Sequence, residues 1–105
     1  MIENRFPIQI RWRSAAEGGR TTPHVNNRYH PTAAIRGNGP HDAFSVVCSF
    51  NTNDGVTASG WLSLLFPENF PEVIEQLSLG ADLMLFEGPR PTAEVHVLVP
   101  SGSIA

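Results

Sequence analysis

Short segments in which apolar and polar residues alternate constrain the fold of this chain more than any other feature. The clearest is residues 6–13, which read Phe-Pro-Ile-Gln-Ile-Arg-Trp-Arg. This is the period of a strand with one buried face, so the even positions, including Trp12, are expected in a core. Comparable strand-like segments follow at residues 32–36, 44–50, 56–66, 82–87 and 92–99.

Turn-forming residues separate these segments. The chain has nine Gly and nine Pro in 105 residues, and Asn53-Asp54-Gly55 is a strong turn signal. About six short strands with such turns indicate an all-β antiparallel barrel or sandwich. A closed barrel would also remove exposed strand edges, which a protein this small must manage. The fold class we expect is a single small antiparallel Greek-key β-barrel. It should form one domain over residues 1–105, with a frayed tail at 100–105.

Residues 67–77 interrupt the alternation. Pro71 suits the first position of a helix, and Phe70, Val73, Ile74 and Leu77 follow helical spacing. We therefore expect a short helix near residues 71–77, ending before Gly80.

The composition excludes several classes of protein. No apolar run approaches the roughly 20 residues of a membrane-spanning helix, so no membrane partner is expected. The single cysteine, Cys48, allows no internal disulfide, and the N-terminus lacks a secretory pattern, so a cytoplasmic location is predicted. Because the chain has no lysine, it can form neither a Schiff base nor a phosphate-binding loop for GTP.

Charge is distributed unevenly along the chain. Residues 1–36 carry six Arg and two Glu, for a net +4, whereas residues 37–105 carry one Arg and eight acids, for a net −7. Such a split indicates either a face with a partner preference or solvent-side charges that the fold intermixes. An arginine patch would use Arg11, Arg13, Arg20, Arg28 and Arg36.

No catalytic residues, metal site or cofactor are predicted. His24, His30, His41, Cys48 and His96 lack any familiar ligand spacing. Cys48 shares a strand face with apolar residues, so it is expected to be a buried structural thiol. His41-Asp42 with a nearby serine does not form a hydrolytic motif, because no nucleophile elbow is present. We therefore predict that the chain is not an enzyme.

The segment 17–23, Glu-Gly-Gly-Arg-Thr-Thr-Pro, is followed by Arg-Tyr-His-Pro at 28–31 and a strand ending at Arg36. This string resembles the opening of the third domain of elongation factor Tu, where a first strand leads into a Glu-Gly-Gly-Arg-His-Thr-Pro loop and then Tyr-Arg-Pro. Here Thr21 stands where the family has His, and His30 where it has Arg. The resemblance covers about residues 6–36. A weaker one is Leu-Gly-Ala-Asp at 79–82, similar to the family's Pro-Gly-Asp turn.

The resemblance implies a β-barrel that contacts the T-stem of aminoacyl-tRNA through its Gly-Gly-Arg loop and also packs against protein partners. The positions it singles out for RNA or partner binding are Gly18, Gly19, Arg20 and Thr21. We add Arg28 to this loop for its charge and Tyr29 for stacking on a base.

Two further aromatic residues are candidates for protein contact. Trp61 lies in the segment 56–66, which is apolar on both faces and is therefore either covered on both sides or part of a partner-binding surface. Phe70 stands between Asn69 and Pro71 in a loop and raises the same possibility. The function expected from the sequence is a non-enzymatic binding module that engages a protein partner or itself. The alternative is a weak RNA-binding module that uses the Gly-Gly-Arg loop on a tRNA-like helix.

Overall fold

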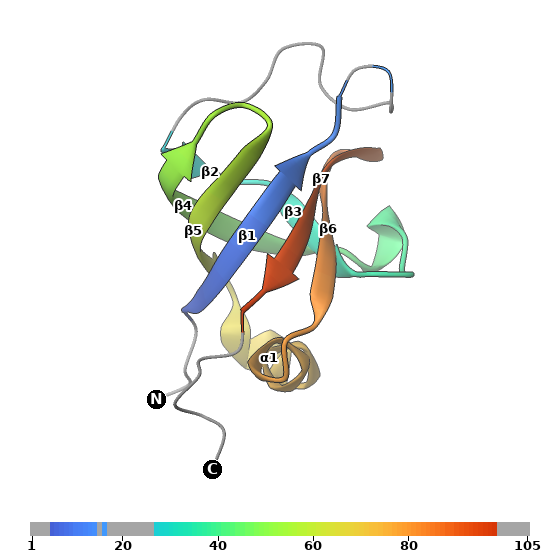
Figure 1. The fold of residues 1–105 in the computed structure, drawn as a ribbon. Coiled ribbons are helices and arrows are strands. Elements are labelled where there is room, and N and C mark those ends of the chain that lie inside the picture. The colour runs from blue at the N-terminus through green and yellow to red at the C-terminus, as the bar shows by residue number, and fades with distance from the viewer. Residues whose placement is uncertain (1–4, 15, 17–26, 99–105) are drawn as a thin grey trace.

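The computed structural model describes residues 5–14, 16 and 27–98, and these residues form an antiparallel β-barrel with a short helix at one end (Figure 1). The strands are β1 (Phe6–Trp12), β2 (Arg28–Tyr29), β3 (Thr32–Ile35), β4 (Phe44–Asn53), β5 (Thr57–Leu64), β6 (Asp82–Glu87) and β7 (Arg90–Val97). The helix is α1 (Pro71–Ser78), and the 3₁₀ turns are η2 (Pro40–Asp42) and η3 (Pro67–Asn69). The predicted tail at residues 100–105 lies outside the described residues.

The sheet closes on itself. Its strand order is β2-β4-β3-β6-β7-β1-β5, and an additional pairing joins β4 to β5. Strand β1 lies beside β5, while β3, β4 and β5 pair in sequence, which is Greek-key connectivity. Within the described residues the all-β closed barrel of six strands that the sequence predicts is therefore confirmed, with β2 as one extra strand.

Strand β2 was not predicted, and its register explains why it exists. Arg28 pairs with Ser49, and Thr32 pairs with Ser45. The two residue numbers add up to 77 in both pairs, so β2 and β3 run along β4 in one continuous antiparallel register. Pro31 interrupts the strand because it has no N–H to donate, yet its carbonyl still accepts from the Val46 N–H at 3.2 Å. Strand β2, with two residues, is too short to show an alternation by itself, whereas β3 falls within the predicted segment 32–36.

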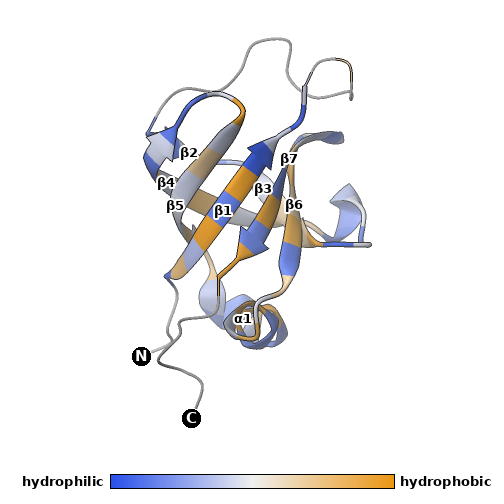
Figure 2. Ribbon diagram, in the orientation of Figure 1, coloured by the Kyte–Doolittle hydropathy of each residue, from blue (hydrophilic) through white to orange (hydrophobic). Residues whose placement is uncertain are grey.

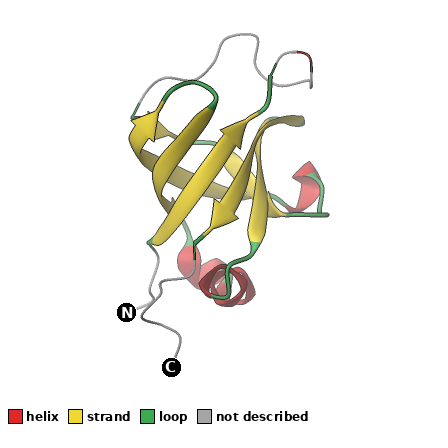
Figure 3. Cartoon of the chain, viewed as in Figure 1, coloured by secondary structure: helices red, strands yellow, loops and turns green. Residues whose placement is uncertain are grey.

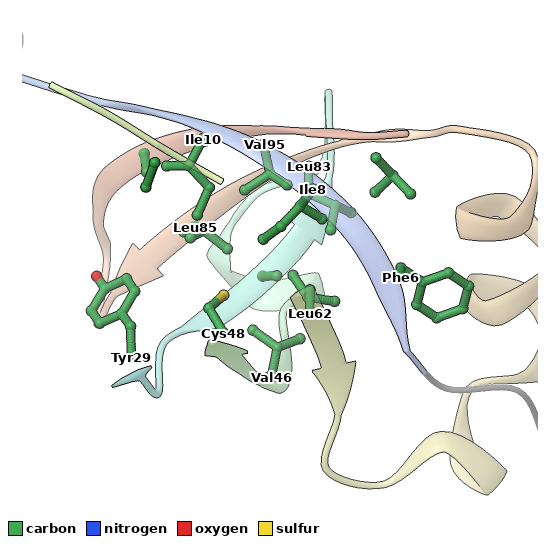
Figure 4. Packing of buried hydrophobic residues seen from close by; sticks show 14 of the residues in the cluster. Phe6, Ile8, Ile10, Tyr29, Val46, Cys48, Leu62, Leu83, Leu85 and Val95 are labelled. Carbon is green, nitrogen blue, oxygen red and sulfur yellow. The ribbon is translucent and has the colours of Figure 1, made fainter. Parts of the chain in front are cut away.

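The core lies inside the barrel, and alternation along each strand fills it. Bands of opposite hydropathy follow one another along β1 and β7 (Figure 2). Phe6 and Tyr29 lie at opposite ends of the buried cluster, with Cys48 and Leu62 between them (Figure 4). Trp12 is buried as predicted, and its Nε1 donates to Asn53 Oδ1 at 2.9 Å.

Helix α1 covers one end of the barrel (Figure 3). Pro71 stands in its first turn, and Leu77 is buried while Val73 and Ile74 pack against the core. Gly80, with φ of 86°, follows the helix in the left-handed conformation common after a helix end. The helix predicted near residues 71–77 is thereby confirmed. Within the described part of the chain, no helix is both long and apolar enough to cross a lipid bilayer.

Asp54 closes the turn between β4 and β5. Its Oδ1 accepts hydrogen bonds from the N–H groups of Thr57 at 2.7 Å and Val56 at 2.8 Å. These backbone bonds favour the charged form and lower the pKa of Asp54 below its ordinary value of 3.8.

We expect this turn to make the fold sensitive to acid. Because the pKa of Asp54 is lower in the folded than in the unfolded state, its stabilising contribution is present above the unfolded value of 3.8 and is lost as the pH falls through the folded value. Asp54→Ala should therefore reduce the slope of stability against pH in this acidic range. Urea unfolding at a series of pH values measures the slope. Glu75→Ala, at an exposed helix carboxylate, is the control, and an unchanged slope in Asp54→Ala would contradict the assignment.

Candidate functional site

A polar groove of about 600 Å³ runs across the outside of the barrel over β5, β1, β7 and β6, which lie side by side in Figure 1. Its first row of side chains is Thr52, Ser59, Gln9, His96, Asp82 and Arg36. Its second row is Thr57, Arg11 and Glu94. These nine residues define the polar groove.

Strand register assembles the first row. Gln9 pairs with Ser59 on one side and with His96 on the other, and His96 in turn pairs with Asp82. Because residues paired across antiparallel strands project to the same face, these side chains stand in one line around the barrel. Arg36 joins the line through its backbone N–H, which donates to the Asp82 carbonyl at 2.9 Å.

At one end of the groove, Asp82 holds two cationic or proton-donating groups. Its Oδ1 lies 2.7 Å from Nδ1 of His96, and its Oδ2 lies 3.7 Å from a terminal nitrogen of Arg36. Since a carboxylate can only accept, Nδ1 carries the proton, and Nε2 is left for a ligand. The Arg36 side chain is 68% exposed and His96 60%, against 41% for Asp82, so the nitrogen groups stand outermost.

In the second row, Glu94 likewise contacts two nitrogen-bearing side chains. Its Oε2 lies 2.7 Å from a terminal nitrogen of Arg11 and 3.6 Å from one of Arg13. Two arginines, Arg11 and Arg36, and two carboxylates, Asp82 and Glu94, therefore line the groove, and Arg13 stands beside it in contact with Glu94. The formal charges of the lining arginines and carboxylates balance.

The middle of the groove offers neutral hydrogen-bonding groups. Gln9 is exposed, and its amide has no hydrogen-bond partner within the described residues. The hydroxyls of Thr52 and Ser59 lie 2.7 Å apart at the far end. The groove thus combines a guanidinium and an imidazole at one end with amide and hydroxyl groups along its floor.

A second surface, the tryptophan face, adjoins the groove along β5 and consists of Pro7, Val47, Trp61 and Leu65. Trp61 pairs with Pro7 on β1, and its ring lies 4.3 Å from the guanidinium carbon of Arg5, a cation–π contact. Leu65 follows the end of β5 and is 48% exposed.

The structure explains why residues 56–66 are apolar on both faces. The strand is shorter than predicted and ends at Leu64. Leu62 and Leu64 face the core, Trp61 faces outward and is half-buried, and Phe66 is 53% exposed beyond the strand. The outer side of β5 is therefore not covered by another layer of the described residues.

Of the residues predicted to form a binding loop, Arg28 and Tyr29 lie within the described part of the chain. Gly18, Gly19, Arg20 and Thr21 lie outside the described residues. Arg28 is exposed on β2, in line with Ser49 and Trp61. Of the arginines predicted as a patch, Arg11 and Arg36 line the polar groove, Arg13 contacts Glu94 at its edge, and Arg28 does not line it.

The position of Tyr29 differs from the one that the sequence analysis predicts. Its side chain is only 6% exposed, and its hydroxyl donates to Glu87 Oε2 at 2.6 Å. The prediction that this ring is available to stack on a base is wrong, because the ring packs edge-on against Trp12 at 5.3 Å. Phe70 is half-buried and lies 5.6 Å from the ring of Phe44, so it packs at the helix end of the barrel.

Cys48 is a buried thiol, as predicted. Burial raises its pKa to about 12, so the reactive thiolate is scarce at neutral pH. Among the described residues, no three His, Cys, Asp or Glu side chains come together as metal ligands would.

Sequence reasoning missed the polar groove. The alternation does place Gln9 and Arg11 on one outward face and Glu94 and His96 on another, which is the signal present in the sequence. It does not say that these two faces are neighbours. Comparison with models of protein families and with curated proteins gives no match for this chain.

Proposed function

We propose that this chain is a protein-binding module with the barrel of an elongation factor Tu third domain, and that it engages its partner through the tryptophan face. The Glu-Gly-Gly-Arg segment at 17–20 and the closed six-stranded Greek-key barrel support the architectural part of the proposal. The partner is another protein or a second copy of the chain.

The outward position of Trp61 carries the proposal. Tryptophan and arginine are enriched among the residues that dominate binding energy at protein interfaces, and Trp61 has Arg5 over its ring. Leu65 and Phe66 extend the apolar surface at the end of the strand. An apolar centre beside a polar rim, here the groove, is the usual anatomy of such interfaces.

Charge and burial favour a protein over RNA. Binding along an RNA backbone requires several phosphates to be neutralised. The two arginines that line the groove are matched by two carboxylates, and the buried Tyr29 has no ring face to offer. RNA binding by the Gly18–Thr21 loop remains the alternative that the sequence suggests.

Site-specific photo-crosslinking tests the proposal. A benzoylphenylalanine at Ser63, which lies between Trp61 and Leu65 on β5, should form a defined adduct with a protein in the producing cell. Leu65→Glu should reduce this adduct about tenfold or more, because it places a charge in an apolar contact. Val56→Glu is the matched control, since Val56 is 66% exposed but lies at the opposite end of β5. The mass of the adduct distinguishes a self-complex from a different partner.

Two results would contradict the proposal. One is an adduct that Leu65→Glu and Val56→Glu weaken equally; the other is a monomer that forms no adduct from Ser63. Salt-sensitive binding of purified tRNA that Arg20→Ala abolishes would instead establish the RNA alternative.

A further inference from the structure

We propose that the polar groove is a binding site for a phosphate monoester of a small hydroxyl-bearing molecule, such as a nucleoside monophosphate or a sugar phosphate. This goes beyond the proposed protein contact, which uses the tryptophan face. The phosphate is placed at Arg36 and His96, and the remainder of the ligand lies over Gln9 toward Ser59.

The phosphate end is defined by the pair of nitrogen groups that Asp82 holds. Both side chains contact the same carboxylate, His96 at 2.7 Å and Arg36 at 3.7 Å, so they stand close to each other. The Arg36 contact is too long for a hydrogen bond, which leaves its N–H groups available to a ligand oxygen. A phosphate arriving from solvent meets the guanidinium and the imidazole before the carboxylate, because Asp82 is the least exposed of the three.

The local charge limits the ligand to about one phosphate. Within the groove, Arg11 already pairs with Glu94 at 2.7 Å, so Arg36 is the guanidinium that remains for the ligand. A phosphate monoester concentrates its charge of about −1.5 to −2 in a single group that one guanidinium can contact. A polyanion would be repelled by Glu94 and Asp82 beyond its first phosphate.

The rest of the groove matches hydroxyl groups. The Gln9 amide, which has no partner within the described residues, offers a donor and an acceptor at the centre. The hydroxyls of Thr52 and Ser59, 2.7 Å apart, can each accept or donate at the far end. The volume of about 600 Å³ falls in the range of sites for small molecules.

Amide NMR of the ¹⁵N-labelled chain tests the site with three probes: inorganic phosphate, adenosine monophosphate and adenosine. Adenosine monophosphate should shift the signals of β1, β6 and β7 around Gln9, Asp82 and His96. Arg36→Gln and His96→Gln should each weaken this binding about tenfold or more, since the first removes the guanidinium and the second removes the imidazole that Asp82 orients at the phosphate end. Arg90→Gln is the control, because it removes the same charge at the β6–β7 turn, away from the groove.

The inference is overturned by any of three results. These are no saturable shift with either phosphate probe up to about 10 mM, above the millimolar range of a weak contact; equal binding of adenosine and adenosine monophosphate; or equal weakening by Arg36→Gln and Arg90→Gln. Leu65→Glu, which tests the protein contact, should leave the adenosine monophosphate shifts unchanged, so the two proposals fail separately.

Discussion

Replacing Gly60 with alanine should destabilise the barrel by about 3 kcal/mol or more, the upper end of the cost of overpacking. Gly60 is buried in β5, where it pairs with Ile8 of β1 and with Phe50 of β4. A Cβ at this position would overlap the carbonyl oxygen of Ser49 and come within 2.8 Å of the Phe50 Cα. Both are backbone atoms of the facing strand, so relief requires the β4–β5 ladder to shift.

The local geometry explains the close approach. The pairing of β4 with β5 shifts register between Phe50 and Thr52, next to Gly60. Such bulges bend a strand sharply and help a small barrel to close. A residue without a side chain at the inside of this bend lets the two backbones meet.

Gly39→Ala is the matched control for the Gly60 substitution. A Cβ at Gly39 meets no atom within 4 Å, and its φ of −96° suits any residue. We expect this variant to change stability by no more than about 0.5 kcal/mol. Urea unfolding followed by tryptophan fluorescence measures both variants. A Gly60→Ala protein as stable as Gly39→Ala would show that the β4–β5 crossing is looser than described.

Replacing Tyr29 with alanine should lower the free energy of unfolding by about 3–5 kcal/mol, as for other buried aromatic residues. The ring fills one end of the core and packs edge-on against Trp12, at an interplanar angle of 64°. Against a total stability of about 5–15 kcal/mol for a domain, this loss removes a large part of the free energy that favours the folded state.

Tyr29→Phe removes only the hydroxyl, so it measures what that group contributes to the free energy of unfolding. The phenolic proton goes to the Glu87 carboxylate, so the Thr92 hydroxyl, 2.8 Å away, donates its own proton to the Tyr29 oxygen. Thr92 is 1% exposed and would keep only its long contact with the Leu85 carbonyl, at 3.5 Å. We expect a cost of about 1–3 kcal/mol, the penalty for leaving buried polar groups unpaired.

Thermal and urea unfolding of the two Tyr29 variants distinguish a core role from a binding role. A residue that stacks on a ligand would tolerate Tyr29→Ala with little change in stability. Full stability of Tyr29→Ala would therefore contradict the buried position. Adding Thr92→Val to Tyr29→Phe should recover part of the loss, because it removes the poorly bonded Thr92 hydroxyl along with its partner.

The core strands could be predicted because their alternation is local. Strand β1 matches the pattern read from residues 6–13 to within one residue, and helix α1 matches the spacing of Val73, Ile74 and Leu77. The two-residue strand β2 could not be found, since two residues show no period and Pro31 separates them from β3. Tyr29 was misplaced for the same reason.

The candidate site depended on information of a different kind. Gln9 and His96 come from opposite ends of the chain and meet because β1 pairs with β7 in one register. A shift of that pairing by one residue would turn every side chain of one strand to the other face. For Trp61, the tertiary structure likewise had to show that no second layer of described residues covers the outer side of β5.

The sequence by itself therefore determined which segments become strands, where the short helix forms, and which face of each long strand enters the core, because these follow from the period of apolar residues along the chain. Only the tertiary structure decided which outward faces are neighbours, which arginines share a carboxylate, and that Tyr29 is internal. Closure of the barrel sets these relations through backbone hydrogen bonds between distant segments. Because every residue type except proline has the same backbone donor and acceptor, the sequence does not show which segments will pair.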